Sequence, residues 1–211
     1  MTGTSNLLIA LAVVMSAVDW MAVARGNSVL EYMAKPAATI AFLASAATLD
    51  VAHGASWAWL LAALVFCLLG DVFLMLPRDA FVPGLASFAV AQIFFTVGFL
   101  SGDAALAGLI AGLVVVVPVG ALLARRYVGA IGRTGQGQLV VPVVAYMVVI
   151  SAMAVASFAD GNPVSIAGAA IFMLSDSLIA ESRFVRARAW HPVGIMVTYH
   201  VALAGLVLGL L

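Results

Sequence analysis

The sequence is poor in charge. Of its 211 residues, 9% are Asp, Glu, Lys or Arg and 65% are hydrophobic, with a mean hydropathy of +1.22. Soluble globular domains are typically about 25% charged and about 45–50% apolar, so this composition excludes that class. The formal net charge is zero, so no long-range field attracts nucleic acid, and we expect none as a partner. The composition indicates a polytopic membrane protein.

Cysteine is almost absent, and so is the basic start of a signal peptide. Cys67 is the only cysteine, which excludes a disulfide within the chain. It lies inside an apolar run, which is typical of an inert buried thiol. The segment Met1–Asn6 contains no Lys or Arg, so we expect the first apolar run to be retained as a helix.

The usual hydrolase motifs are also missing. The sequence contains neither HxxxH nor HExxH, and it has no GxSxG elbow. Of the three histidines, His53 and His191 fall in predicted loops and only His200 lies deep in an apolar run. A three-ligand zinc site therefore lacks ligands, and a serine triad lacks its base. We expect no metal and no cofactor.

What is present is a series of apolar stretches near the length of about 20 residues that crosses a bilayer. The connections are short and contain Gly, Pro, Asn or Asp. The sequence thus predicts an all-α bundle of about eight transmembrane helices in a single domain, residues 1–211. The second stretch is the shortest, and we expect its helix to begin within Gly26–Ala34. The predicted spans are Asn6–Ala24, Lys35–Leu49, Trp57–Leu76, Val82–Leu100, Ala104–Ala124, Leu139–Phe158, Val164–Ser182 and Val193–Leu211.

Basic residues are confined to alternate connections. All nine Lys and Arg residues fall in the odd-numbered connections, whereas the even-numbered ones contain Asp50, Asp103 and Asp160. Positively charged loops of membrane proteins stay in the cytoplasm. The pattern therefore predicts cytoplasmic odd-numbered loops and both termini on the outer side.

Two aspartates interrupt the apolar runs, in segments that resemble each other. Asp71 lies in Leu69–Met75 and Asp176 in Leu174–Ala180, and an arginine follows each aspartate by seven residues. An ionisable group at membrane depth is costly unless a partner or water stabilises it, so its default interpretation is functional. Both aspartates are predicted to lie about 10 Å inside the cytoplasmic helix ends.

The spacing of these features indicates an internal repeat. The two aspartates are 105 positions apart, each on the third helix of a four-helix half, and Pro36 and Pro142 are 106 positions apart. Because each half has an even number of helices, two copies share one orientation. We therefore expect a parallel four-plus-four arrangement.

Other polar residues enter the apolar runs at the level of the aspartates. We expect them to line a cavity in the cytoplasmic half of the bundle. Each also has a structural interpretation: the lysine can extend to the interface, the glutamine and tyrosines can join helices, and the histidine can be a core residue. The candidates are Lys35, Gln92, Tyr146, Tyr199 and His200, with Arg183 at the helix end as a ligand for an anionic head group.

Two carboxyls in an apolar setting favour different functions. A protonated carboxyl beside an ionised one suits acid-catalysed opening of an acetal or enol ether. The same pair suits a proton-coupled transporter or flippase of a small lipid or solute. A structural or regulatory membrane protein without turnover is the third interpretation, and it leaves the matched aspartates unexplained.

Four segments resemble the YhhN family of membrane lysoplasmalogenases: Tyr32–Pro36, Leu69–Met75, Leu174–Ala180 and Thr198-Tyr199. The resemblance implies an eight-helix enzyme that hydrolyses the vinyl ether bond of a lysoplasmalogen to a fatty aldehyde and a glycerophospho-head group. It also implies that Asp71 and Asp176 are catalytic, that the partner is a lysophospholipid from the bilayer, and that the protein lies in a bacterial inner (plasma) membrane.

The sequence departs from the family pattern around the aspartates. Gln92 and Phe95 stand where members tend to carry a histidine and then a tyrosine, and His200 follows the final tyrosine where a second tyrosine is common. These differences bear on substrate identity more than on reaction class. In the implied mechanism, one aspartate protonates the vinyl carbon and the other stabilises the oxocarbenium ion and activates water.

Overall fold

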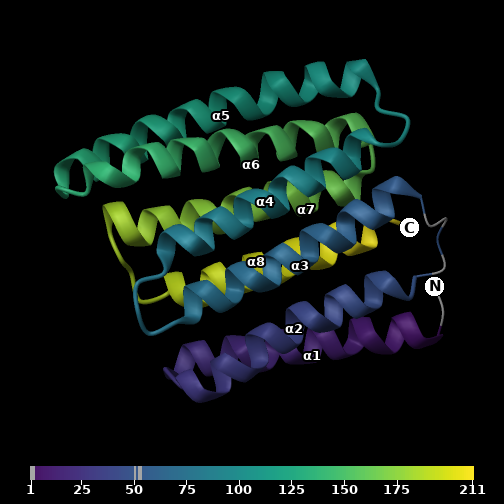
Figure 1. Ribbon diagram of the computed structural model, residues 1–211, viewed down its shortest axis with the longest axis horizontal. Coiled ribbons are helices and arrows are strands. Elements are labelled where there is room, and N and C mark those ends of the chain that lie inside the picture. Colours follow the sequence, from purple (N-terminus) through teal and green to yellow (C-terminus); the bar gives the residue numbers. More distant parts are fainter. Residues whose placement is uncertain (1–2, 50, 52–53) are drawn as a thin grey trace.

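The computed structural model describes residues 3–49, 51 and 54–211, and within these ranges the chain forms eight α-helices (Figure 1). Asp50 and His53, both assigned to a loop from the sequence, lie outside the described residues. A 3₁₀ turn, Gly137–Leu139, precedes α6, and a π-helical turn, Glu181–Val185, follows α7. The α-helices are α1 Gly3–Arg25, α2 Ser28–Ala47, α3 Ala55–Met75, α4 Phe81–Leu100, α5 Leu106–Arg133, α6 Val140–Asp160, α7 Pro163–Ala180 and α8 His191–Leu208.

Short polar segments set several helix boundaries. The Asn27 side chain accepts a hydrogen bond from the Leu30 N–H (3.1 Å) and caps α2. Gly161 ends α6 with φ of 75°, a left-handed conformation that favours glycine. Asn162 then caps α7 by accepting from the Val164 N–H (2.8 Å), with Pro163 as the first helical residue.

One predicted boundary was confirmed and two were wrong. The helix α2 begins at Ser28, within the predicted Gly26–Ala34, because Asn27 caps it, and Pro36 lies inside the helix. The helix α5 continues nine residues beyond Ala124 to Arg133. His191, assigned to a loop, is the first residue of α8 and is buried.

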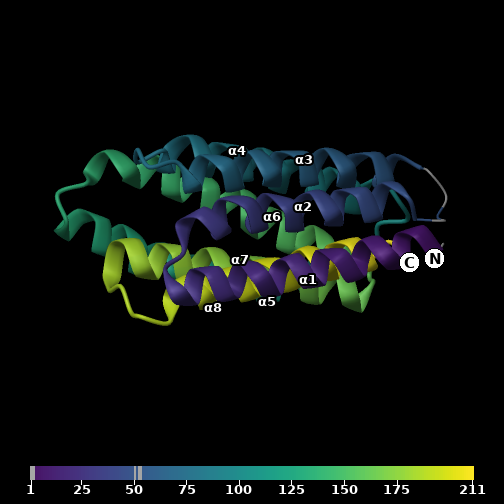
Figure 2. The same cartoon turned by 90° about the horizontal axis from the view of Figure 1, so that it is seen from below.

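The helices lie side by side along one direction, and both termini are at the same end (Figure 1). Seen from below, α3 and α4 lie on one side of the molecule and α1 and α8 on the other (Figure 2). The helix α5 stands at the edge of the bundle. It packs against α6 and the two short turns but does not pack along α4.

The packing pattern of the first four helices recurs in the last four. Helix α1 packs on α2 and α3 on α4, just as α5 packs on α6 and α7 on α8. Helix α4 packs on α6, and its counterpart α8 packs on α2. This pattern is the one that a parallel four-plus-four arrangement predicts, although α1 packs on α8 and α5 has no corresponding contact along α4.

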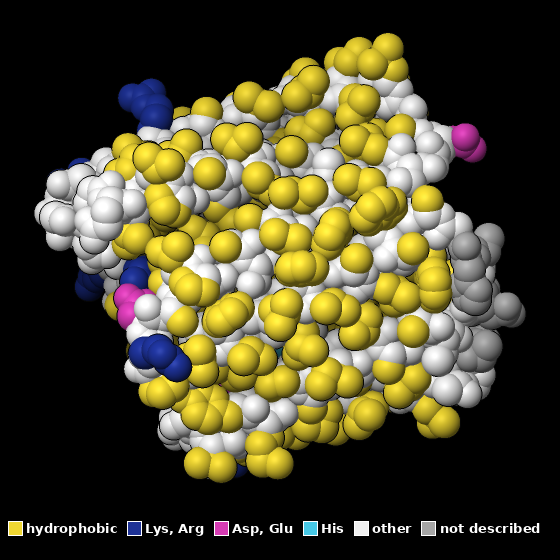
Figure 3. All heavy atoms as spheres, viewed as in Figure 1, with side chains coloured by type: hydrophobic (Ala, Val, Ile, Leu, Met, Phe, Trp, Pro, Cys, Tyr) yellow, Lys and Arg dark blue, Asp and Glu magenta, His cyan; other side chains and the backbone are white. Residues whose placement is uncertain are grey.

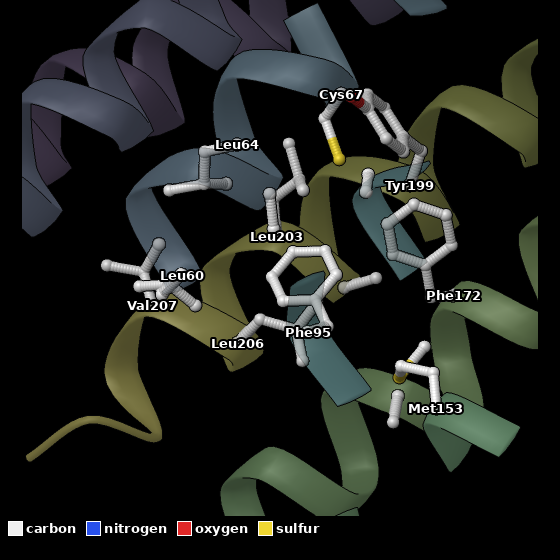
Figure 4. Close-up of a cluster of buried hydrophobic side chains, with 14 of the residues drawn as sticks. Leu60, Leu64, Cys67, Phe95, Met153, Phe172, Tyr199, Leu203, Leu206 and Val207 are labelled. Atoms are coloured by element: carbon white, nitrogen blue, oxygen red, sulfur yellow. The ribbon is translucent and has the colours of Figure 1, made fainter. Parts of the chain in front are cut away.

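The core lies where α3 and α4 face α7 and α8. Its side chains include Phe95, Phe172 and Leu203, all within 2% of full burial (Figure 4). On the face seen in Figure 3, hydrophobic side chains are spread over all parts of the bundle, and the visible Lys and Arg side chains gather at the end where α5 finishes and α6 starts. Among the described helices, seven are long and apolar enough to cross a membrane, α2 being the exception. The chain is a multi-pass membrane protein.

Candidate functional site

Asp71 lies at the centre of a buried polar cluster built by three helices. It is on α3 and is 1% exposed. Its Oδ2 accepts hydrogen bonds from the hydroxyls of Thr39 on α2 (2.7 Å) and Tyr199 on α8 (2.8 Å). The ammonium of Lys35, also on α2, lies 3.5 Å from Oδ1. Donors in this arrangement suit a carboxylate, and the lysine charge offsets part of the cost of burying it.

Helical spacing brings the two α2 donors to one carboxyl. Lys35 and Thr39 are four residues apart, so they share a helix face, and both are buried. On α3, Gly70 precedes Asp71, and a Cβ built there would lie 2.5 Å from the Phe88 ring. The glycine thus lets α4 approach α3 closely beside the cluster. Lys35 and Tyr199 are among the site residues predicted from the sequence, whereas Thr39 was missed.

Asp176 lies in a different setting. It is half-buried on α7 and lines an apolar cavity of about 60 Å³ between α3, α4, α5, α6 and α7. The hydroxyl of Tyr146 on α6 donates a hydrogen bond to its Oδ2. A cavity of this size holds a few water molecules. Of the two matched aspartates, Asp176 is therefore the one that lines a cavity.

Gln92 borders the Asp176 cluster. It is fully buried on α4, and its side chain lies close to the Tyr146 hydroxyl. Within the described ranges, neither polar atom of its amide has a hydrogen-bond partner of good geometry. Buried polar groups are nearly always hydrogen-bonded, so the Gln92 amide beside Tyr146 is an exception among the buried polar groups.

An aromatic layer separates Asp71 from the cavity. The Phe88 ring lines the cavity and packs edge-on against Tyr199, with ring centroids 5.9 Å apart. Phe172 packs on both rings, at 6.2 Å and 5.7 Å. No hydrogen bond between the described residues joins the two carboxyls. The structure thus forms two acidic clusters, where the depth estimate predicted one shared cavity.

Asp19 is a third buried acid, and the sequence analysis missed it. It lies on α1, is 0% exposed, and neither carboxyl oxygen has a hydrogen-bond partner among the described residues. Lys35 and Asp71 are close enough for their charges to act on it. The signal that could have found it is the one used for Asp71, a carboxylate inside an apolar run. Lys35 is therefore paired with Asp71, and only its charge acts on Asp19.

His200 belongs to the edge of the same cluster. The indole N–H of Trp20, the residue after Asp19, donates to His200 Nδ1 over 3.0 Å. The other ring nitrogen, Nε2, is buried without a partner in the described part of the chain. His200 is thus held by α1, and no contact places it against Asp176.

Arg183 lies at the mouth of the cavity, outside the apolar layer. Its guanidinium is 4.1 Å from the centroid of the Phe81 ring, and both Phe81 and Phe184 line the cavity. Arg183 Nη2 donates to Asp79 Oδ2 over 2.7 Å. This hydrogen bond and the arginine charge hold the pKa of Asp79 below its ordinary value. Arg183 is therefore a cationic group within reach of the pocket entrance.

Among the described residues, no three His, Cys, Asp or Glu side chains are grouped so that they could hold an ion. The site residues predicted from the sequence instead divide into three places. Lys35 and Tyr199 contact Asp71, with His200 nearby; Tyr146 contacts Asp176, with Gln92 beside it; and Arg183 stands at the rim.

The fold and these clusters define a class: a polytopic helical membrane protein with carboxyls held inside the bundle and an apolar pocket beneath a basic rim. Comparison with known proteins agrees with this class. The YhhN family model matches residues 30–210. The chain belongs to the YhhN family.

Curated relatives cover most of the chain. Lysoplasmalogenase TMEM86B of Mus musculus is 34% identical over 162 residues, which are 76% of this chain and 67% of the mouse protein. The lysoplasmalogenase of Mycobacterium bovis is 33% identical over 177 residues, 81% of this chain and 67% of that protein. Human TMEM86B is 31% identical over 140 residues, 66% of this chain and 58% of its own length. No solved structure matches.

Proposed function

We propose that this protein is a membrane-embedded hydrolase that cleaves the vinyl ether bond of a lysoplasmalogen. The products are a fatty aldehyde and a glycerophospho-head group. The observation that carries the proposal is the Tyr146–Asp176 hydrogen bond inside an apolar cavity. Relatives named lysoplasmalogenase, at 31–34% identity, support the reaction class.

Asp176 is the proposed acid because it faces the cavity. Its protonated carboxyl donates a proton to the vinyl carbon distant from the ether oxygen, and an oxocarbenium ion forms. The resulting carboxylate takes a proton from the water that adds to this cation. The hemiacetal then collapses, its hydroxyl proton passes to the leaving glycerol oxygen, and the aldehyde is released. Tyr146 and the free amide of Gln92 orient the water and the ether oxygen.

Asp71 is the second proposed catalytic carboxyl, and it acts from across the aromatic layer. With Asp19 and Lys35 it forms a group of two carboxyls and one ammonium. A negative potential beside an apolar cavity stabilises a cation that forms there. Arg183 at the rim is the proposed ligand for the phosphate of the head group.

We propose that the basic end of the bundle is cytoplasmic, with both termini on the outer side of a bacterial inner membrane. The gathering of Lys and Arg at one end supports this orientation (Figure 3). Gly102 and Gly135 lie in exposed connections at opposite ends, and Cys67 is buried. In intact cells, an impermeant maleimide should label Gly102→Cys but not Gly135→Cys. The reverse pattern would invert the topology.

The test of the reaction is aldehyde release from vinyl ether lysolipids by purified protein in detergent. Wild type should release aldehyde, whereas Asp71→Asn and Asp176→Asn should not. Asp103→Asn, an exposed carboxyl at the opposite end, is the matched control and should retain activity. Absence of release from choline, ethanolamine and glycerol head groups would overturn the proposal.

A proton-coupled transporter or flippase is the second candidate. The recurring helix packing favours it, because transporters are often built from such repeats. The position of the cavity, at one end of the bundle rather than at mid-depth, favours the enzyme. Proton flux into vesicles that depends on Asp71 and on an added lysolipid, without aldehyde release, would select the transporter.

A further inference from the structure

We propose that the groove between α5 and α6, bordered by α4, is the binding site for the long alkenyl chain of the substrate. The inference rests on the proposed function and adds to it a site that selects chain length. The groove is lined almost entirely by apolar side chains. Its lining residues on α5 include Leu109, Leu113 and Ala124, and on α6 they include Val148 and Ala152.

Volume is the first reason to place the chain in this groove. The cavity at Asp176 measures about 60 Å³, and the groove measures about 480 Å³. Pockets that enclose organic ligands of moderate size are usually about 300–1,000 Å³. The cavity therefore accommodates the reacting bond and water but not a long chain, so the chain leaves it for adjacent apolar space.

The groove adjoins the cavity, which is the second reason. Met147 lines both spaces. Gly120 lines the groove, and a Cβ built on it would lie 3.9 Å from Cε of Met173, which lines the cavity. The same Cβ would lie 2.8 Å from Ser151 Oγ, so a side chain at position 120 would occupy the junction. Met147, a flexible residue, therefore forms part of the boundary between the groove and the cavity.

The groove also runs in the direction that a membrane lipid requires. On α5 it extends from Ala124, beside the cavity, to Leu109 near the opposite end. These residues are 15 positions apart, which corresponds to about 22 Å along the helix. With the head group at Arg183 and the vinyl ether at Asp176, the chain in this groove points toward the middle of the bilayer.

The helix α5 is fixed at both ends of the groove. At one end Gly108 and Gly112 lie directly on the backbone of Phe158 and Val155 of α6, where a Cβ would clash. At the other end Arg126 and Glu181 form a bidentate ion pair (2.7 and 2.8 Å). Because α5 does not pack along α4 between these points, the groove stays open to lipid.

The test compares two alanine-to-phenylalanine variants on the same helix. Ala121 is exposed and lines the groove, whereas Ala111 is exposed on α5 outside it. Both substitutions add the same apolar bulk at lipid-facing positions. Ala152→Phe fills the groove from α6 and serves if Ala121→Phe does not fold. The ligands are saturated ether lysolipids with a short or a long chain, and binding is measured by native mass spectrometry in detergent.

Ala121→Phe should weaken binding of the long-chain ligand by at least about tenfold, because the added ring takes the place of several methylenes. Binding of the short-chain ligand should not change, and Ala111→Phe should behave as wild type. Equal effects of Ala121→Phe on both ligands, or no effect on either, would overturn the proposal that the groove binds the alkenyl chain. Chain-selective binding without any aldehyde release from vinyl ether lysolipids would overturn the proposed reaction and leave the groove supported.

Discussion

The Tyr199 hydroxyl donates a hydrogen bond to Asp71 across 2.8 Å, joining residues that are 128 positions apart. Tyr146 makes the corresponding bond to Asp176 within the second half of the chain. The two acids differ in what else surrounds them. Asp71 is sealed with Lys35 and Thr39, whereas Asp176 faces a cavity. Two similar sequence segments have thus been given different environments by their neighbours.

Substitution at the cavity should affect turnover more than stability. Asp176→Asn removes the proton donor, and we expect kcat to fall by about 10²–10⁴-fold. Tyr146→Phe leaves the carboxyl but removes the donor that orients it, so its loss should be smaller. Aldehyde release at saturating substrate, with thermal unfolding in detergent as the control, measures both. A Tyr146→Phe variant slower than Asp176→Asn would contradict the assignment of the acid.

Loss of the Lys35 ammonium should destabilise the fold. Lys35→Met leaves Asp71 and Asp19 buried without their shared cation, and removal of one partner of a buried ion pair costs about 3–5 kcal/mol. The free energy of unfolding, followed by helical circular dichroism in detergent with denaturant, checks this. Lys35→Arg keeps the charge and should lose less. Wild-type stability in Lys35→Met would mean that the acids do not need the lysine.

Asp19→Asn should raise the free energy of unfolding, whereas Lys35→Met should lower it. Asp19 is a buried carboxyl without a hydrogen-bond partner among the described residues, and its replacement by a neutral isostere relieves a buried charge. We expect a gain of about 1 kcal/mol in the free energy of unfolding. The cost of Lys35→Met should also be smaller in the Asp19→Asn background, with a coupling of about 0.5–3 kcal/mol. Additive effects of the two substitutions would show that Lys35 does not serve Asp19.

The Asp79–Arg183 pair should be sensitive to acid and salt. Because Arg183 holds the pKa of Asp79 below the ordinary value of 3.8, the pair contributes stability above that value. The contribution is lost as the pH falls through the lower folded-state pKa. The difference in Tm between wild type and Asp79→Asn should therefore be small, constant near neutral pH, and absent in strong acid. Both groups are exposed, so about 1 M salt should also abolish it.

The sequence was sufficient for the helices and for the two aspartates because both follow from local chemistry. A run of apolar residues between turn residues crosses the membrane whatever surrounds it. A carboxylate inside such a run indicates a functional site because it is costly to place at membrane depth. Asp19 also lies inside an apolar run, but its segment has no second copy in the sequence of the kind that Asp71 and Asp176 share.

The exact start of α2 and the extent of α5 were harder to predict. Asn27 caps α2 eight residues before Lys35, so the helix begins well ahead of its apolar run. The helix α5 continues past its apolar part because Arg126 forms an ion pair with Glu181 and the Tyr127 hydroxyl donates a hydrogen bond to the Ser177 carbonyl. Contacts with other elements therefore make α5 longer than the length of its apolar stretch predicts.

The sequence by itself determined the membrane class, the number of helices and the position of Asp71 and Asp176 inside apolar helices. Only the tertiary structure decided which side chains meet each acid, since contacts between helices depend on packing and rotation that residue spacing within one helix does not specify. Packing paired Lys35 with Asp71, put the Phe88 ring between Tyr199 and the cavity, and held α5 away from α4 so that a groove remains.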